Sequence, residues 1–353
     1  MYQEFDSVLE KSSFLPGFFQ LGVDCTQFTI PYMQKLNPTL ENERDGSIVG
    51  KVSWIFDLKN NILLDCGVGD FDYDVPRQTM EHINILDKYY QEVKAVLEFD
   101  HGYFSLEAMH VLSLDQNKRF VFRLDEKNLE EFQNQLKPGE EKVVQFQLTV
   151  AQTREYRDNR KLRNEMLSTT YKIRFAKPII GVNPDGSPKY VAIATNIFPK
   201  EATLAELINA YRDRWNAETS YDYLKNDLMI EQFYGNDLKV ILRQIYAAWQ
   251  VFNSIIPMAS RARKLPNEPL FENGDDINWE DMVNRIDEVE DEYSTVFKKC
   301  TNNYIKLFCE DDPIKIPRLL DQTLEKVENE LLPAALIRES VKQEVESRRS
   351  DNI

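Results

Sequence analysis

Four polar residues in the stretch YRDRWNAETSYDYLK, residues 211–225, have the types and spacing for phosphate chemistry. Tyr211, Arg214, Glu218 and Lys225 sit at offsets of zero, three, seven and fourteen, so on a helix they fall within roughly 60° of one another. Amphipathic helices normally turn apolar residues toward the protein, so this polar stripe is either a solvated face or the wall of a charged site. In a charged site, Glu218 would bind a divalent cation, and Arg214 and Lys225 would hold phosphates.

Two further acids stand where strands of a sheet would bring them together. Asp24 lies in the middle of LGVDCTQFTIP, and Asp100 lies at the carboxyl end of AVLEFD. Open α/β sheets place their sites at strand ends. With Glu218 these acids make a trio of carboxylates, which suits two Mg²⁺ or Mn²⁺ ions about 4 Å apart that activate water or a DNA 3′-hydroxyl. Without metal, the carboxylates are expected to repel one another.

The first acid has an alternative. Asp45 in RDGS offers an Asp-Gly-Ser of its own, although a turn is the commonest role of that dipeptide. Asp24 is therefore preferred, and Asp45 stays open.

The elements that must position these acids follow from the hydrophobic pattern. Residues 18–30, 50–60 and 61–69 alternate as three strands, with a tight turn at Asn60-Asn61. A helix over 77–93, a buried strand over 94–99, a helix opened by Ser105 and a strand over 118–124 complete the order β-β-β-α-β-α-β.

The rest of the chain suggests an insertion and a return to the core. Strands are expected at 142–151 and 169–181, with a turn at NPDGS, and then at 190–198. Thr203 and Glu206 form a capping box before a long helix without Gly or Pro until Gly235, and this helix carries the polar stripe. The expected organisation is an N-terminal remnant (1–17), a core in two parts (18–124 and 191–257), a β-rich insertion (125–190) and an acidic helical region (258–353).

Charge and composition narrow the function classes. The net charge of −16 argues on its face against nucleic acid, yet residues 154–177 hold eight Lys/Arg against three acids. Within this basic stretch Arg157, Arg160 and Lys161 are expected to contact the DNA backbone, unless the stretch is a solvated β-hairpin face. The four cysteines lack CxxC spacing, which disfavours zinc sites and disulfides. No apolar run approaches the roughly 18 residues of a membrane span and no signal peptide begins the chain, which predicts a cytoplasmic protein.

Three motifs carry a family resemblance. Tyr211-x2-Arg214-x3-Glu218-x6-Lys225 resembles the YREK signature of the DDE transposases of bacterial insertion sequences, the IS-four type. DHGY, which begins at Asp100, is similar in part to the family's D-x-G-x-x-aromatic neighbourhood, with His where most relatives have Arg. The stretch that begins Asp24-Cys25-Thr26 and ends in Ile-Pro resembles the family's D-G-T then L-P stretch, with Cys in place of Gly. The resemblance covers about residues 18–257.

The resemblance implies a fold and a reaction. The fold is α/β, a ribonuclease H-like mixed sheet flanked by helices, with a β-rich insertion before the helix of the catalytic Glu. Asp24, Asp100 and Glu218 would be the catalytic residues and the ligands of two Mg²⁺ or Mn²⁺ ions, and Tyr211, Arg214 and Lys225 would position phosphates. The partner would be DNA, both transposon ends and target, with a homodimer in a synaptic complex left open.

The same resemblance leaves alternatives. Relatives carry a DNA-binding region ahead of the first Asp, whereas only 23 residues precede Asp24, so a truncated chain is expected. Relatives also place an aromatic in the insertion that stacks on a flipped base; without Trp between 125 and 210, Tyr156 and Tyr171 are the candidates. A truncated remnant that binds DNA or inhibits an intact transposase, or a nuclease on the same fold, are the alternatives to a transposase.

Overall fold

The computed structural model describes residues 9–30, 48–69, 74–183, 185–214, 225, 231–233 and 238–262. Asp45, Glu218 and nearly all of the region 258–353 lie outside the described residues. The chain divides into two compact units, Met1–Tyr246 and Ala247–Ile353, and the site described below belongs to the first. Within the described part of the chain, no helix is both long and apolar enough to cross a membrane.

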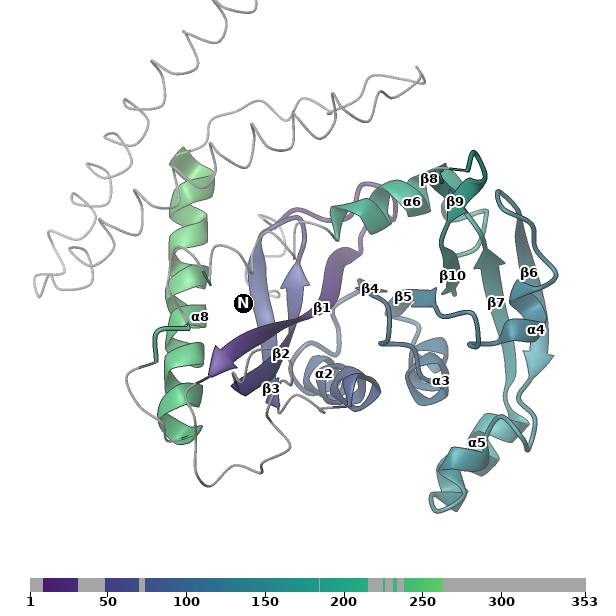
Figure 1. Ribbon diagram of the computed structural model, residues 1–353, viewed down its shortest axis with the longest axis horizontal. Coiled ribbons are helices and arrows are strands. Elements are labelled where there is room, and N and C mark those ends of the chain that lie inside the picture. Colours follow the sequence, from purple (N-terminus) through teal and green to yellow (C-terminus); the bar gives the residue numbers. More distant parts are fainter. Residues whose placement is uncertain are drawn as a thin grey trace, which may run out of the picture. The chain divides into compact units, whose positions relative to one another are not determined.

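An eight-stranded sheet organises the first unit (Figure 1), in the order β3-β2-β1-β4-β5-β10-β7-β6. Its strands are β1 (Phe19–Ile30), β2 (Ile48–Asp57), β3 (Ile62–Gly69), β4 (Ala95–Phe99), β5 (Lys118–Leu124), β6 (Glu141–Gln147), β7 (Thr170–Ala176) and β10 (Ala192–Thr195). The first three strands pair antiparallel, whereas β1, β4 and β5 pair parallel. The order and directions of β3-β2-β1-β4-β5 are those of a ribonuclease H-like mixed sheet, as predicted from the sequence.

Helices begin where the sequence supplies caps. Helix α2 (Val75–Tyr89) has Pro in its first turn, and α3 (Leu106–Leu114) begins at Ser105, whose hydroxyl accepts from the Ala108 N–H. Helix α6 (Leu204–Asp213) begins at the expected capping box of Thr203 and Glu206. The helix expected to continue to Gly235 is described as α6 up to Asp213, and Arg214 follows in the same right-handed conformation. Helix α8 covers Leu238–Ala262.

The two faces of the sheet carry separate hydrophobic clusters. On one face, Leu97 and Phe99 of β4 share a cluster with side chains of α2 and α3. On the other face, Val96 of β4 shares a cluster with Leu207 and Ala210 of α6. Figure 1 shows α2 and α3 on one side of the strands and α6 on the other. Because side chains alternate along a strand, even-numbered residues of β4 face α6 and odd-numbered residues face α2 and α3.

The segment 125–190 extends this sheet. Strands β6 and β7 pair antiparallel, and β10 joins β7 to β5. Strands β8 (Ile179–Val182) and β9 (Pro188–Tyr190) form a separate hairpin. The short α4 (Glu130–Gln133) precedes β6. Between β6 and β7 lie η2 (Arg154–Tyr156) and α5 (Arg160–Ser168). The alternative of a solvated β-hairpin face is therefore wrong for the first half of the basic stretch, because a helix capped by Asn159 occupies it.

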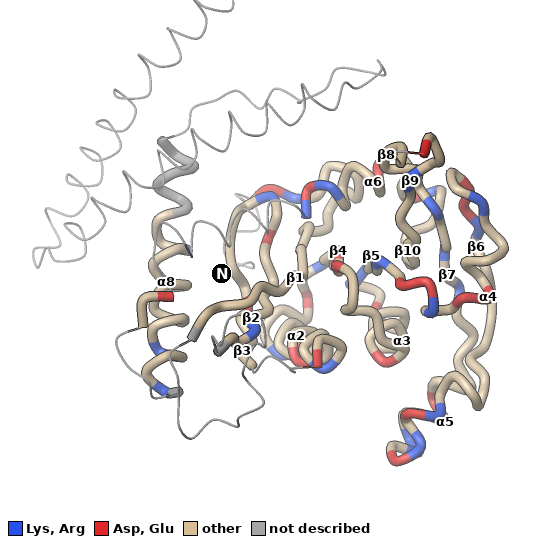
Figure 2. Tube along the Cα trace, viewed as in Figure 1, with Lys and Arg blue, Asp and Glu red and all other residues tan. Residues whose placement is uncertain are grey.

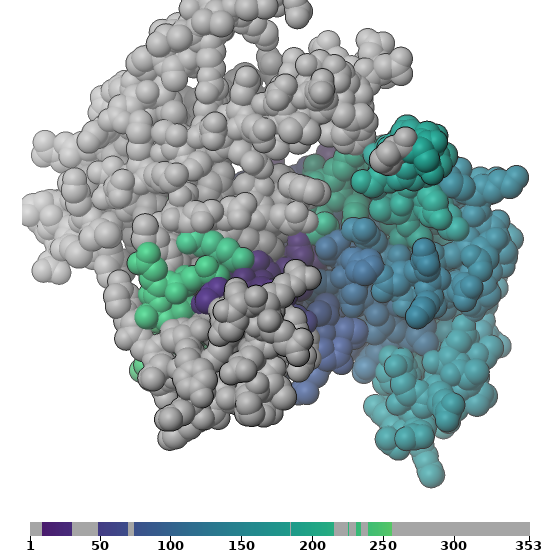
Figure 3. All heavy atoms as spheres, in the orientation of Figure 1, coloured from purple at the N-terminus to yellow at the C-terminus, as the bar shows by residue number. Residues whose placement is uncertain are grey.

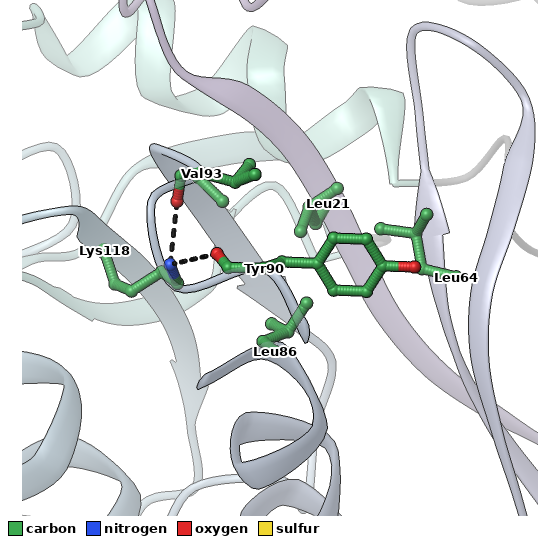
Figure 4. Close-up of a pocket in the computed structure, with 7 residues that line it drawn as sticks. Leu21, Leu64, Leu86, Tyr90, Val93 and Lys118 are labelled. Carbon is green, nitrogen blue, oxygen red and sulfur yellow. Dashed lines mark hydrogen bonds between the residues drawn. The ribbon is translucent and has the colours of Figure 1, made fainter. Parts of the chain in front are cut away.

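A small cavity lies at the amino ends of β4 and β5 (Figure 4), lined by Leu21, Leu64, Leu86, Tyr90, Val93, Ala95 and Lys118. Its volume of about 10 Å³ holds no more than one water. The Lys118 ammonium donates to the carbonyls of Val93 at 2.7 Å and Tyr90 at 3.4 Å, and burial lowers the pKa of Lys118. The cavity is at the opposite edge of the sheet from Asp100, so it belongs to the packing of the core.

Candidate active site

The pairing of β1 with β4 brings the two aspartates together. Val23 of β1 lies opposite Phe99 of β4 in parallel register, and the Asp100 N–H donates to the Val23 carbonyl at 3.4 Å. Asp24 therefore lies beside the carboxyl end of β4, where Asp100 follows the strand. Its side chain shares the strand face of Gln20, which is the α6 face, and only 5% of Asp24 is exposed.

A single guanidinium joins these two carboxylates. Arg214 Nη1 donates to Asp24 Oδ2 at 2.6 Å, and Arg214 Nη2 lies 3.3 Å from Asp100 Oδ1. The Arg214 side chain is 6% exposed, so these charge-assisted contacts are shielded from water. The Arg214 cation between the two carboxylates offsets the repulsion that is expected between them without metal.

Tyr211 closes the site on the Asp100 side. Its hydroxyl donates to Asp100 Oδ1 at 3.2 Å, and the Arg214 guanidinium lies 5.4 Å from the centre of its ring. Burial raises the pKa of Tyr211, so its hydroxyl remains a donor at neutral pH. Tyr211 and Arg214, two members of the polar stripe, therefore face the carboxylates.

Arg123 is a further residue of the site, and it belongs to none of the motifs found in the sequence. Its Nη1 lies 3.4 Å from Asp100 Oδ1, and the side chain is 38% exposed. A signal for it was present in the strand pattern: Phe99 pairs with Phe122 in parallel register, so the next residue of β5 lies beside Asp100. Arg123 offers a partly exposed cation at the rim of the site.

Lys225 contacts β1 just beyond Asp24 in the sequence. Its ammonium donates to Thr26 Oγ1 at 2.8 Å and lies 5.2 Å from the centre of the Phe28 ring. Thr26 follows Asp24 by two residues and therefore points to the same face of the strand. The structure thus brings Lys225 to the face that carries Asp24, Asp100, Tyr211 and Arg214.

Two carboxylates of the site offer oxygen ligands to a divalent cation. Asp24 and Asp100 both contact the Arg214 guanidinium, and carboxylate oxygens are the hard ligands that Mg²⁺ and Mn²⁺ prefer. Glu218, the third expected ligand, lies outside the described residues. Among the residues that are described, no group of three His, Cys, Asp or Glu side chains is placed to hold a metal.

A buried acid, Glu98, lies on the strand that leads to Asp100. Glu98, two residues before Asp100, is fully buried, and its carboxyl Oε1 accepts from Gln20 Nε2 at 3.0 Å. The same Gln20 amide donates to the Ala210 carbonyl of α6 at 3.1 Å. Burial first, and then the nearby Asp213 carboxylate, raises the pKa of Glu98 well above its usual range. Gln20 of β1 therefore links the buried Glu98 carboxyl group of β4 to the helix that carries Tyr211.

Replacement of Glu98 by glutamine is expected to raise the free energy of unfolding at pH 8 and to leave it nearly unchanged at pH 4. Because the folded pKa of Glu98 is raised, its contribution is fully present below the unfolded pKa and is lost as pH rises toward the folded pKa. The loss is up to about 1.4 kcal/mol for each pH unit in that window, and glutamine avoids it. Urea unfolding across this pH range measures the difference. Glu126→Gln at the surface controls for net charge, and parallel profiles of the parent and Glu98→Gln would contradict the assignment.

The basic stretch separates into exposed and buried cations. Arg157, Arg160 and Lys161 are all exposed, on or just before α5. Figure 2 shows blue Lys/Arg and red Asp/Glu segments along α5, and Figure 3 shows the lobe that contains it projecting from the lower edge of the coloured surface. Arg174 of β7 is fully buried, donates to the Ala202 carbonyl at 2.7 Å, and cannot reach DNA.

The two aromatic candidates of the insertion differ in access. Tyr171 is 1% exposed, and burial raises the pKa of Tyr171 to about 12, so its ring is not available to a base. Tyr156 is half-buried and lines a groove of about 660 Å³, and its hydroxyl lies 3.3 Å from the Glu107 N–H of α3. Phe104, four residues after Asp100, lines the same groove.

Comparisons with known proteins give one family match. A family model described as "Transposase DDE domain" matches residues 51–249, more than half of the 353 residues. A comparison with curated proteins gave no match. Among solved structures, the chain is similar to one described as "Cryo-EM structure of piggyBac transposase synaptic complex with hairpin DNA (SNHP)", at 12% identity and a TM-score of 0.41. That similarity covers 87% of this chain, which spans 57% of the length of the other.

Proposed function

The chain belongs to the transposase DDE domain family, and we propose that it is a DNA transposase of the insertion-sequence type with the YREK signature. The proposed reaction is metal-dependent cleavage of DNA at the ends of a mobile element, followed by transfer of the freed 3′-hydroxyl to target DNA. The observation that carries this proposal is the convergence of the Asp24 and Asp100 carboxylates on Arg214 at the carboxyl end of β4.

The proposed roles follow from the contacts. Asp24, Asp100 and Glu218 would hold two Mg²⁺ or Mn²⁺ ions. When bound, the ions supply an activated water or 3′-hydroxyl and stabilise the leaving oxygen. Arg214 already sits between the two aspartates, and Tyr211 donates to one of them, so both can bind a phosphate brought to the same place.

Two further cations would position the DNA backbone. Lys225 reaches the face of β1 beside Asp24, and Arg123 lies at the rim beside Asp100. A lysine supplies a point charge to a phosphate, whereas arginine offers a planar fork. The proposed partner is therefore DNA, with its scissile phosphate at the aspartates.

Exposed cations near α5 support a second region of DNA binding. We expect the triple variant Arg157→Ala, Arg160→Ala, Lys161→Ala to flatten the salt dependence of DNA binding. The slope of log affinity against log salt should fall by about 0.9 for each DNA phosphate that the variant no longer neutralises. A fluorescence binding titration at several salt concentrations measures this slope. Lys137→Ala, Lys142→Ala, Lys189→Ala, a triple variant of exposed lysines with the same change in charge, is the matched control; equal slopes in both would remove α5 from the interface.

A cleavage and joining assay tests the function. The purified full chain is incubated with supercoiled plasmid and Mn²⁺, and the product ends are mapped. We expect nicked DNA with 3′-hydroxyl ends. The nicking should require Mn²⁺ or Mg²⁺, and a chelator should abolish it. A pre-cleaved duplex with a 3′-hydroxyl end should join to the plasmid, which separates a transposase from a nuclease. DNA binding without any cleavage would support the alternative of a non-transposing remnant.

A further inference from the structure

A series of hydrogen-bonded polar side chains, three of them buried, crosses the face of the sheet opposite Arg214. Asp65 of β3 lies 2.6 Å from His82 Nδ1 of α2, and His82 Nε2 lies 2.9 Å from Ser53 Oγ of β2. Ser53 Oγ in turn lies 2.8 Å from the Tyr103 hydroxyl. Ser53, His82 and Tyr103 are each exposed by 1% or less. Polar groups buried this deeply destabilise a fold unless each finds a partner, so the chain is a specific arrangement.

The three hydrogen bonds connect these side chains in series. The Asp65 carboxylate only accepts, so His82 donates to it from Nδ1, and the other ring nitrogen, Nε2, pairs with the Ser53 hydroxyl. Ser53 Oγ and the Tyr103 hydroxyl share the next hydrogen bond, in which either oxygen can donate. Burial raises the pKa of Tyr103 well above its usual range, which keeps this hydroxyl protonated. The series of hydrogen bonds therefore runs without a break from Asp65 to Tyr103.

The chain ends at both aspartates of the site. Tyr103 closes the turn that carries Asp100: its N–H lies 3.4 Å from the Asp100 carbonyl, and Gly102 takes the left-handed conformation, φ 90°, that the turn requires. The Tyr103 hydroxyl also faces the Cys25 thiol: burial raises the pKa of that thiol, and the hydroxyl acts against the rise. The Cys25 N–H donates to Asp24 Oδ1 at 2.7 Å. Tyr103 therefore reaches Asp24 through Cys25 and reaches Asp100 through the turn.

We propose that Tyr103 is a positioning residue, and that the chain Asp65–His82–Ser53–Tyr103 fixes the spacing of the Asp24 and Asp100 carboxylates. The proposal rests on the proposed function, because it takes these carboxylates to share a metal. Groups behind metal ligands commonly change metal affinity by about 10- to 100-fold when they are removed. A phenylalanine would fill the space of the Tyr103 ring, so the hydroxyl serves this polar chain and not the packing alone.

Metal binding by the full chain, without DNA, tests the proposal. Mn²⁺ affinity is measured by electron paramagnetic resonance in the parent, Tyr103→Phe, Ser53→Ala and the double variant. Each single variant should raise the dissociation constant of Mn²⁺ about tenfold, and the double variant should be no worse, because both singles break the same hydrogen bond. Tyr171→Phe is the matched control: Tyr171 is equally buried, and its hydroxyl lies 2.8 Å from His110 Nδ1, in a hydrogen bond that includes neither aspartate.

Hydrogen exchange in the metal-free chain provides a second readout. The amides of residues 100–103 should exchange faster in Tyr103→Phe and Ser53→Ala than in the parent, and at the parental rate in Tyr171→Phe. Unchanged Mn²⁺ affinity in the two variants, or an equal loss in Tyr171→Phe, would overturn the proposal. If the parent itself binds no Mn²⁺, the proposed function fails. The exchange rates then decide whether the Asp65–His82–Ser53–Tyr103 hydrogen bonds hold the turn at residues 100–103. Faster exchange in the two variants supports this role, and parental exchange rates overturn it.

Discussion

Asp100→Asn is expected to lower the rate of DNA cleavage by at least about 10³-fold while the fold is retained. Removal of a group behind a metal ligand already costs about 10- to 100-fold, so loss of a ligand's charge should cost more. Asparagine keeps the shape of Asp100 and one oxygen that can accept from Tyr211 and Arg214. The rate of plasmid nicking at saturating Mn²⁺ measures the effect, and circular dichroism checks the fold.

Asp115→Asn is the matched control for this variant. Asp115 ends α3 at the opposite edge of the sheet, and its Oδ1 accepts from the Asn117 N–H, a role that asparagine can keep. It should therefore cleave DNA at the parental rate. A folded Asp100→Asn that cleaves within about tenfold of the parent would remove Asp100 from the catalytic site.

Arg214→Gln should lower the free energy of unfolding by about 3 kcal/mol without metal, because it leaves Asp24 and Asp100 facing each other without their shared cation. The same variant should bind Mn²⁺ about tenfold more tightly without DNA, since the metal no longer competes with a guanidinium for the carboxylates; tenfold corresponds to about 1.4 kcal/mol. Binding of DNA should weaken. Urea unfolding and Mn²⁺ titration of the DNA-free protein measure the first two effects, and a fluorescence titration with DNA measures the third.

Arg123→Gln is the control for the loss of a cation near Asp100. The Arg123 guanidinium lies 3.4 Å from Asp100, and the Arg123 side chain is 38% exposed. Loss of this ion pair should therefore change the free energy of unfolding by less than about 1 kcal/mol. If Arg214→Gln bound Mn²⁺ more weakly than the parent, Arg214 would be a support of the metal site and not its competitor.

Much of the frame of the site was predictable from the sequence. The strands that carry Asp24 and precede Asp100 have clear periodicity, and parallel pairing then places both residues at one edge. The helix start at Thr203 was also predictable, because the capping box is a local pattern. Helical spacing brought Tyr211 and Arg214 to the same face, and both contact Asp100. Local sequence patterns therefore predict the strands, the helix start and the helix face that form the site.

Other features depend on contacts between distant residues. The spacing of the polar stripe predicts the helix face on which Arg214 lies. It does not predict that the Arg214 side chain bridges the two aspartates instead of pointing to solvent. Ser53, His82 and Tyr103 come from three parts of the chain, and only the folded sheet and α2 bring them together. Arg174 belongs to the basic stretch in the sequence, yet β7 buries it against the carbonyls that precede α6.

A crystal of the protein soaked with Mn²⁺ would show whether Asp24 and Asp100 share a divalent metal, the feature on which the proposed reaction depends. Anomalous scattering locates the manganese without reference to activity. We expect manganese bound to oxygens of both Asp24 and Asp100, with the Arg214 guanidinium moved off Asp24. Manganese absent from both carboxylates at saturating concentration, with Arg214 still bridging them, would show that the two aspartates form an ion-pair network and not a metal site.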